Sequence, residues 1–174
     1  MSPQKPVNPP NFTLVTALAR DLQASAIAAG LTVATAESCT GGNVAHAITG
    51  VAGSSGYFQG SVVSYSNDVK ARVLGVPAAV LASPGAVSEP CARAMAEGVR
   101  ELMGTDLAVA TTGIAGPDGG TARKPVGLVH FAVATGDGTV ASHEVFPGDR
   151  AAIIEAATAR ALELLIEAMP AGDR

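Results

Sequence analysis

The turn that follows residue 37 constrains the fold more than any other part of the chain. Residues 31–36 are almost continuously apolar, which predicts a strand buried on both faces. A serine, a thiol, a threonine and two glycines come next, and apolar residues then recur at helical spacing at Val44, Ala47 and Ile48. A strand buried on both faces needs helices to cover it, so the segment favours an α/β architecture.

Helices and strands alternate along the rest of the chain. Helices are expected over residues 14–29, 69–74, 88–103 and 149–165, with a further turn of helix at 77–82. Strands are expected over residues 57–65, 106–112, 126–134 and 139–146, and the last two are joined by the hairpin signal Gly136-Asp137-Gly138. The predicted fold is therefore of the α/β class, a mixed sheet with helices on both faces.

The composition agrees with one packed domain. The chain has 174 residues, of which 48% are apolar and 15% charged, and this balance favours a folded core over disorder. We expect a single domain over residues 13–170, preceded by a flexible tail over residues 1–12 that contains four prolines. No repeat and no internal domain boundary is visible within residues 13–170.

Charge and hydropathy exclude several classes of protein. The net charge of −4, without a cluster of Lys or Arg, argues against a nucleic-acid surface. No run of about 18 apolar residues is present to cross a membrane, and no signal peptide is visible. We therefore expect a soluble cytoplasmic protein with neither a nucleic-acid nor a membrane partner.

Ser38 is the first candidate for a catalytic group. A strand-to-helix turn lifts a hydroxyl out of the sheet, where it can act as a nucleophile. The same position suits an ordinary helix N-cap, because serine is common there. Cys39 is a rival nucleophile near a helix N-terminus, although free cysteines are more often buried.

Other strand ends carry hydroxyls that could meet Ser38 at one edge of the sheet. Tyr65 with Asn67 follows the second strand, and Thr112 ends the third. Lys70 lies in the first turn of the next helix, close enough in sequence to face the same edge. A Ser–Lys or Ser–Tyr–Lys arrangement can activate a serine without histidine.

Two further features could bind an anion. The glycine-rich loop over residues 113–120 is either a flexible connection or a backbone nest for an anion, to which Lys124 could add charge. Arg150 follows the helix cap Asp149, where a cation opposes the helix dipole; it is either paired with that cap or held for a phosphate or carboxylate. No spacing of His, Cys or Asp suggests zinc, so we expect neither a metal nor a cofactor.

Seven short motifs then occur in one order along the chain, from about Thr13 to Ala168. They are Ala36-Glu37-Ser38-Cys39-Thr40-Gly41-Gly42, Gly53-Ser54-Ser55, Val63-Ser64-Tyr65-Ser66-Asn67 with Lys70, Gly85-Ala86-Val87-Ser88, Thr112-Gly113-Ile114-Ala115-Gly116-Pro117, Lys124-Pro125-Val126-Gly127 and Gly148-Asp149-Arg150. Together they closely resemble the C-terminal domain family of the competence/damage-inducible protein A.

The resemblance implies a fold and an activity. It implies a three-layer α/β/α sandwich, self-association into a homo-oligomer, and hydrolysis of the carboxamide of nicotinamide mononucleotide to nicotinic acid mononucleotide and ammonia. It also implies the stand-alone form of the family, without the additional N-terminal domain of larger members.

The motifs also imply roles for individual residues. Ser38 is the expected nucleophile, Tyr65 and Lys70 are expected to move its proton, and either of them could be the base. Ser55 and Thr112 are expected to contact the substrate or the developing oxyanion, and Arg150 its phosphate. Substrate-binding residues are further expected at Thr40, Gly41, Gly42, Asn67 and Gly113.

Two alternatives remain open from the sequence. The same scaffold could hydrolyse another nucleotide-like amide, or it could be a catalytically silent nucleotide-binding or regulatory module, because a fold does not determine a function.

Overall fold

The computed structural model describes residues 13–170, and the predicted tail over residues 1–12 lies outside the described residues. Within them the chain forms, in order, α1 (Leu14–Ala29), β1 (Val33–Glu37), α2 (Asn43–Thr49), a short 3-10 helix (Ser54–Gly56), β2 (Phe58–Val63), α3 (Asn67–Leu74), α4 (Ala78–Ala82), α5 (Glu89–Met103), β3 (Leu107–Gly113), β4 (Leu128–Thr135), β5 (Gly138–Val145) and α6 (Arg150–Glu167). Each predicted helix and strand is present, with ends shifted by a few residues.

The five strands form one mixed sheet in the order β2-β1-β3-β4-β5. Strand β1 pairs in parallel with both β2 and β3, whereas β4 runs antiparallel to β3 and β5 antiparallel to β4. Because β1, β2 and β3 point the same way, the residues that follow them meet at one edge of the sheet. The predicted mixed sheet is confirmed.

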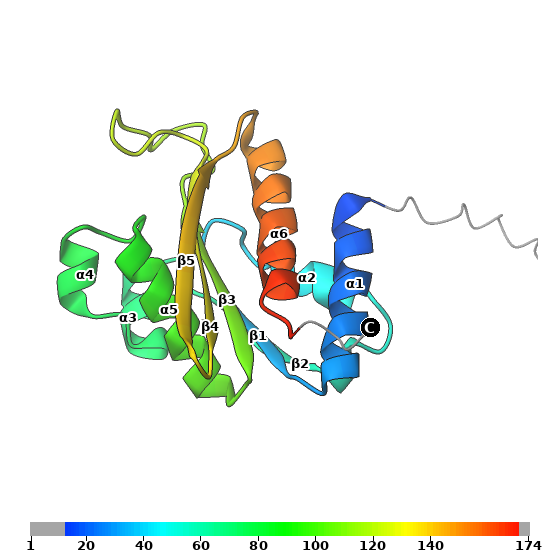
Figure 1. The fold of residues 1–174 in the computed structure, drawn as a ribbon. Coiled ribbons are helices and arrows are strands. Elements are labelled where there is room, and N and C mark those ends of the chain that lie inside the picture. The colour runs from blue at the N-terminus through cyan, green and yellow to red at the C-terminus, as the bar shows by residue number, and fades with distance from the viewer. Residues whose placement is uncertain (1–12, 171–174) are drawn as a thin grey trace, which may run out of the picture.

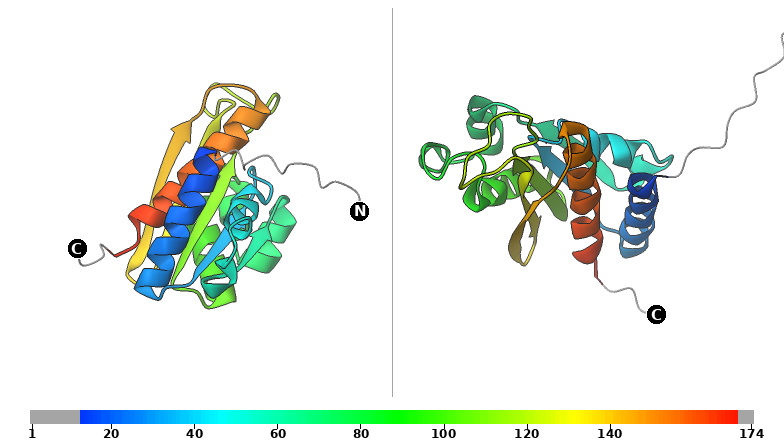
Figure 2. Two further views of the ribbon diagram at one scale, coloured as in Figure 1. Left: turned by 90° about the vertical axis from the view of Figure 1, so that its right-hand side faces the viewer. Right: turned by 90° about the horizontal axis from the view of Figure 1, so that it is seen from above.

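Helices cover both faces of this sheet. Helices α1, α2 and α6 pack on one face, and α3, α4 and α5 on the other (Figure 1). In the left view of Figure 2, α1 and α6 lie side by side on the same face of the sheet. The three-layer α/β/α sandwich is therefore confirmed.

The two faces of the sheet differ in the size of their side chains. Val109, Phe131 and Val133 pack toward α6, whereas Ala110 and Ala132 on the same strands pack toward α5. Alternation of large and small residues follows from the period of two in a strand. The alanines let α5 lie close to the sheet, beside the strand edge described below.

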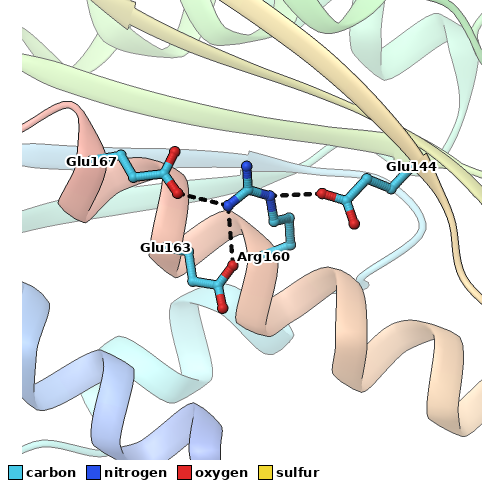
Figure 3. A network of polar contacts seen from close by, with 4 residues as sticks. All are labelled: Glu144, Arg160, Glu163 and Glu167. Carbon is cyan, nitrogen blue, oxygen red and sulfur yellow. Dashed lines mark hydrogen bonds and ion pairs between the residues drawn. The ribbon is translucent and has the colours of Figure 1, made fainter.

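An ion-pair network joins the edge strand β5 to α6 (Figure 3). Arg160 Nε lies 2.7 Å from Glu144 Oε1 on β5, and Arg160 Nη1 lies 3.0 Å from Glu163 Oε2 and 2.8 Å from Glu167 Oε1 on α6. Three carboxylates around one guanidinium fix the helix against the strand at the end of the sheet.

Among residues 13–170, no helix combines the length and apolar character that crossing a membrane requires.

Candidate active site

A cavity of about 300 Å³ opens where β1, β2 and β3 end. All four predicted catalytic residues line it, together with three of the predicted substrate-binding residues: Ser38, Tyr65, Lys70, Thr112, Asn67, Gly113 and Arg150. They come from segments far apart in the sequence, and the parallel strands bring them together. The expectation that hydroxyls gather at this edge is confirmed.

Lys70 makes the closest contact with Ser38. Its Nζ lies 3.0 Å from Ser38 Oγ and also donates a hydrogen bond to the carbonyl oxygen of Ser64 at 2.6 Å. Helix α3 begins at Asn67, after Ser66 caps it through the N–H of Val69, so its first turn points Lys70 back under the turn after β1. The carbonyl of Ser64 fixes the amine in this place.

Lys70 is buried, with only 1% of its surface exposed. Burial lowers the pKa of its amine below the ordinary value of 10.5, because the charged form loses its hydration. A lysine with a lowered pKa deprotonates closer to neutral pH, and its lone pair can then accept a proton from a neighbouring hydroxyl. Lys70 therefore has the properties of a base for Ser38.

Tyr65 lies at the mouth of the cavity rather than at Ser38. It is 62% exposed, and its hydroxyl accepts a hydrogen bond from Arg150 Nη2 at 3.0 Å. Arg150 also donates from Nη1 to the carbonyl oxygen of Gly116 at 2.7 Å. The Arg150 guanidinium at the start of α6 is thus held across the mouth by two segments, the one after β2 and the loop after β3, with further N–H groups for an anion.

Thr112 faces the same cavity from β3. Its hydroxyl donates to the carbonyl oxygen of Ala86 at 2.7 Å, and it is buried. The neighbouring Thr111 points to the opposite face of the sheet, where its hydroxyl lies 2.8 Å from that of Thr40. Strand alternation therefore separates the two threonines, so that Thr112 lines the cavity and Thr111 does not.

Glu37 organises the turn beside Ser38. Its carboxylate is fully buried and accepts hydrogen bonds from the N–H groups of Gly42, Val44 and Ala45 and from the hydroxyl of Thr40. The three N–H groups are among the first donors of α2, which a helix leaves without partners of its own. A side chain of the protein therefore occupies the N-terminus of α2, next to Thr40, Gly41 and Gly42, which were expected to bind substrate.

This arrangement corrects the alternative role expected for Ser38. Gly42, not Ser38, is the N-cap residue of α2, and the Glu37 carboxylate takes the place of a cap side chain. The Ser38 hydroxyl instead points to Lys70. Serine as a helix cap was wrong because the chain makes a further turn, over residues 38–42, before the helix begins.

Four predicted substrate-binding residues do not line the cavity. Thr40 is buried behind the turn with its hydroxyl on Glu37, and the N–H of Gly42 is also bonded to Glu37. The N–H of Gly41 is bonded to the carbonyl of Ser38. Ser55 is exposed in the 3-10 helix that precedes β2, at the opposite end of that strand from Tyr65. For these four residues, contact with a ligand in this cavity is not supported.

Cys39 lines the cavity but is a poor rival to Ser38. It is 6% exposed, and burial raises the pKa of its thiol to about 12. The thiolate, which is the nucleophilic form, is then scarce at neutral pH. The second cysteine, Cys91, is buried in α5, where burial also raises its thiol pKa.

The structure adds lining residues to which the motifs assigned no individual role. They are Ala86, Val87, Ile114, Ala115, Gly116 and Asp118. The glycine-rich character of residues 113–120 was the signal for the last four. Lys124, expected to add charge to this loop, lies outside the cavity, with its Nζ donating to the carbonyl of Pro84. Among residues 13–170, no group of three metal-ligating side chains is found.

Comparison with known proteins gives one consistent family. The family model of the CinA C-terminal domain matches residues 15–169. A CinA-like protein of Mycolicibacterium gilvum is 53% identical over 153 residues, which are 87% of this chain and 36% of that protein. A CinA-like protein of Geobacter sulfurreducens is 54% identical over 136 residues, 78% of this chain and 33% of that protein. The chain thus spans about a third of the length of these relatives.

Solved structures agree with the fold. The crystal structure of a competence/damage-inducible protein from Agrobacterium tumefaciens has a TM-score of 0.87 and 42% identity, covering 90% of this chain and 96% of that chain. A competence damage-inducible protein A from Klebsiella pneumoniae has a TM-score of 0.87 and 36% identity, covering 91% of this chain and 99% of that one. These proteins match this chain over nearly their whole length.

Proposed function

The chain belongs to the CinA C-terminal domain family, and on this premise we propose that it is a nicotinamide-nucleotide amidohydrolase. The proposed reaction converts the carboxamide of nicotinamide mononucleotide into a carboxylate and releases ammonia. The resemblance of the motifs supplies the substrate. The contact between Ser38 Oγ and the buried amine of Lys70 is the observation that carries the proposal.

In the first half of the reaction, Ser38 attacks the carboxamide carbon. Neutral Lys70 takes the proton from Ser38 Oγ while the new C–O bond forms. The carbonyl of Ser64 accepts one N–H of Lys70, which leaves the lone pair directed at Ser38. The geometry favours Lys70 over Tyr65 as the base, because the Tyr65 hydroxyl is bonded to Arg150 instead.

The tetrahedral intermediate needs donors for its oxyanion. The N–H groups of Gly41 and Gly42 are bonded within the turn, so they are not free for this role. In the described part of the chain, the N–H groups of Ala115 and Gly116 have no acceptor, and both residues line the cavity. We assign the oxyanion to this loop.

The intermediate then collapses to an ester of Ser38, and water hydrolyses this ester in a second step. The C–N bond breaks, and Lys70 returns its proton to the leaving nitrogen, which departs as ammonia. A water molecule next attacks the ester carbon, gives a proton to Lys70 and releases the carboxylic acid. Ser38 recovers its proton, so the cycle consumes one water and needs no other reactant.

Arg150 is the proposed phosphate ligand. Its guanidinium crosses the cavity mouth, and the fork of N–H donors suits a phosphate. The other cavity residues carry few charges, which suits an uncharged carboxamide deeper inside. Asp118 is the acidic exception on the wall.

Ammonia release from nicotinamide mononucleotide by the purified protein tests the proposal. Ammonia and nicotinic acid mononucleotide should form in equal amounts, and Lys70→Met protein prepared in the same way controls for contaminating amidases. Arg150→Ala should weaken use of the mononucleotide far more than use of the riboside that lacks the phosphate. A protein that binds the mononucleotide without releasing ammonia would be the silent module instead.

A further inference from the structure

A second cavity, of about 430 Å³, lies beside the catalytic one on the α5 side of the sheet. Its walls are the start of α5, the segment before β4, and a histidine pair on β4 and β5. Val87 lines both cavities, so a single residue separates them there. No step of the proposed reaction uses the second cavity.

The histidine pair on the wall of this cavity contains a buried polar atom without a partner. His130 and His143 face each other across the β4–β5 ladder, with ring centroids 5.2 Å apart. Within residues 13–170, the buried Nδ1 of His130 has no hydrogen-bond partner. A buried polar atom without a partner costs free energy. Two imidazoles this close also repel each other once both are protonated, and a bound anion would offset that repulsion.

The charges around the pair are mostly positive. Arg123 and Lys124 line the cavity with the two histidines. Glu89 is the acidic group on the wall, and its carboxylate is already paired with Arg93 at 2.8 Å. The field inside the cavity therefore favours an anion over a cation.

Lys124 from the second cavity and Thr112 from the catalytic one hold the wall between the two cavities. Lys124 Nζ donates to the carbonyl of Pro84 at 2.6 Å, and Thr112 donates to the carbonyl of Ala86 at 2.7 Å. Both contacts fix the short segment 84–87 between the two cavities. A ligand that draws Lys124 away from Pro84 will therefore displace Ala86 and Val87 in the same segment.

We propose that the second cavity is a regulatory site for a small phosphate-bearing anion, bound by His130, His143, Lys124 and Arg123. The proposal does not depend on which amide the catalytic cavity hydrolyses. An imidazolium pair and two long cationic side chains offer several donors to one phosphate group.

The protonation of the histidines supplies a direct readout. Burial lowers the pKa of His130, and the neighbouring His143 and Lys124 lower it further, against an opposite effect of Glu89. Arg123 adds a further positive charge nearby. A bound phosphate reverses the sign of the local field, so the pKa of His130 should rise by about one pH unit.

The experiment follows the imidazole protons by NMR during pH titrations of untagged protein. The chain has three histidines, and His46 on α2 lies on the other side of the sheet as an internal control. The titrations are made with and without inorganic phosphate, and chloride keeps the ionic strength matched. The protein carries Arg150→Ala, so that the catalytic cavity does not contribute to phosphate binding. As phosphate is added, the titration midpoint of His130 should rise until it saturates. The imidazole resonances of His143 should respond with it, and those of His46 should not.

Two further arms complete the test. Adenosine monophosphate replaces inorganic phosphate, and a stronger response would identify a nucleotide as the source of the phosphate group. Lys124→Met with Arg123→Gln should weaken phosphate binding about tenfold or more while the spectrum stays that of folded protein. The proposal is overturned if phosphate shifts all three histidines alike, if it produces no saturable shift, or if the double substitution leaves binding unchanged.

Discussion

Lys70 Nζ lies 3.0 Å from Ser38 Oγ, although 32 residues separate the two in the chain. The parallel pairing of β1 with β2 brings the ends of both strands to one edge, and the first turn of α3 then carries Lys70 beneath the turn that holds Ser38. The same burial that suits Lys70 to its proposed role as a base works against the stability of the fold, since the charged amine is deprived of water.

Lys70→Met should therefore stabilise the protein while abolishing ammonia release. Methionine fills a similar volume without a charge, and we expect a gain on the order of 1 kcal/mol in the free energy of unfolding at neutral pH. Between the lowered pKa of folded Lys70 and the ordinary value of 10.5, the unfolded wild-type chain binds more protons, so wild-type stability rises with pH across that window. The advantage of the variant should shrink accordingly as pH rises.

Urea unfolding at several pH values measures this difference. Arg72→Met is the matched control, because Arg72 lies on the same helix and its side chain is 73% exposed in an ion pair with Asp68. Its stability should stay near that of the wild type. A Lys70→Met protein that is less stable than the wild type at every pH would show that the buried amine stabilises the fold.

The pH dependence of ammonia release should report Lys70 as well. Activity needs the neutral amine, so kcat/KM should rise with pH through an ascending limb whose midpoint lies below 10.5. Tyr65→Phe should keep that limb, since the Tyr65 hydroxyl contacts Arg150 rather than Ser38. Steady-state kinetics on both proteins tests this, and loss of the limb in Tyr65→Phe would make the tyrosine the base.

Glu37→Gln should destabilise the protein by about 1–3 kcal/mol. The amide has one acceptor oxygen in place of two, and it loses the charge-assisted bonds to the N–H groups that begin α2. Exposed Glu97 on α5 provides the control substitution, Glu97→Gln, with an expected change close to zero. Chemical denaturation compares the two, and equal stabilities would remove the structural role assigned to Glu37.

Arg160→Met should cost about 1 kcal/mol of stability in dilute buffer and leave the kinetics of ammonia release unchanged. The side chain is only 24% exposed and joins Glu144 on β5 to Glu163 and Glu167 on α6 (Figure 3). Pairs that are partly exposed weaken with added salt, so the difference from the wild type should shrink at high ionic strength. A salt-independent loss measured by thermal unfolding would point to packing instead.

Local pattern was sufficient to predict most of the fold. Hydrophobic periodicity and capping residues located the helices, since Gly30 and Gly104 end α1 and α5 in left-handed conformations as their positions indicated. The hairpin signal at residues 136–138 likewise predicted the β4–β5 pair.

The candidate site was predictable only in part. Strand ends predicted the approach of Ser38, Tyr65, Lys70 and Thr112, because parallel strands end at one edge. The burial of Glu37 was not foreseen, since a carboxylate is ordinarily exposed and only the tertiary structure shows that helix N–H groups surround it. Ser55 precedes β2 and so lies at the amino end of that strand, away from the cavity; only its motif, not its position, suggested contact with a ligand.

The central claim is that Ser38, rather than the adjacent thiol, attacks the amide. Ammonia release by Ser38→Ala and Cys39→Ala, measured side by side on nicotinamide mononucleotide, tests it most directly. We predict that Ser38→Ala loses at least about a thousandfold in kcat, while Cys39→Ala stays within a few-fold of the wild type because its thiol, with a pKa of about 12, remains protonated. Activity that persists in Ser38→Ala and disappears in Cys39→Ala would contradict the account.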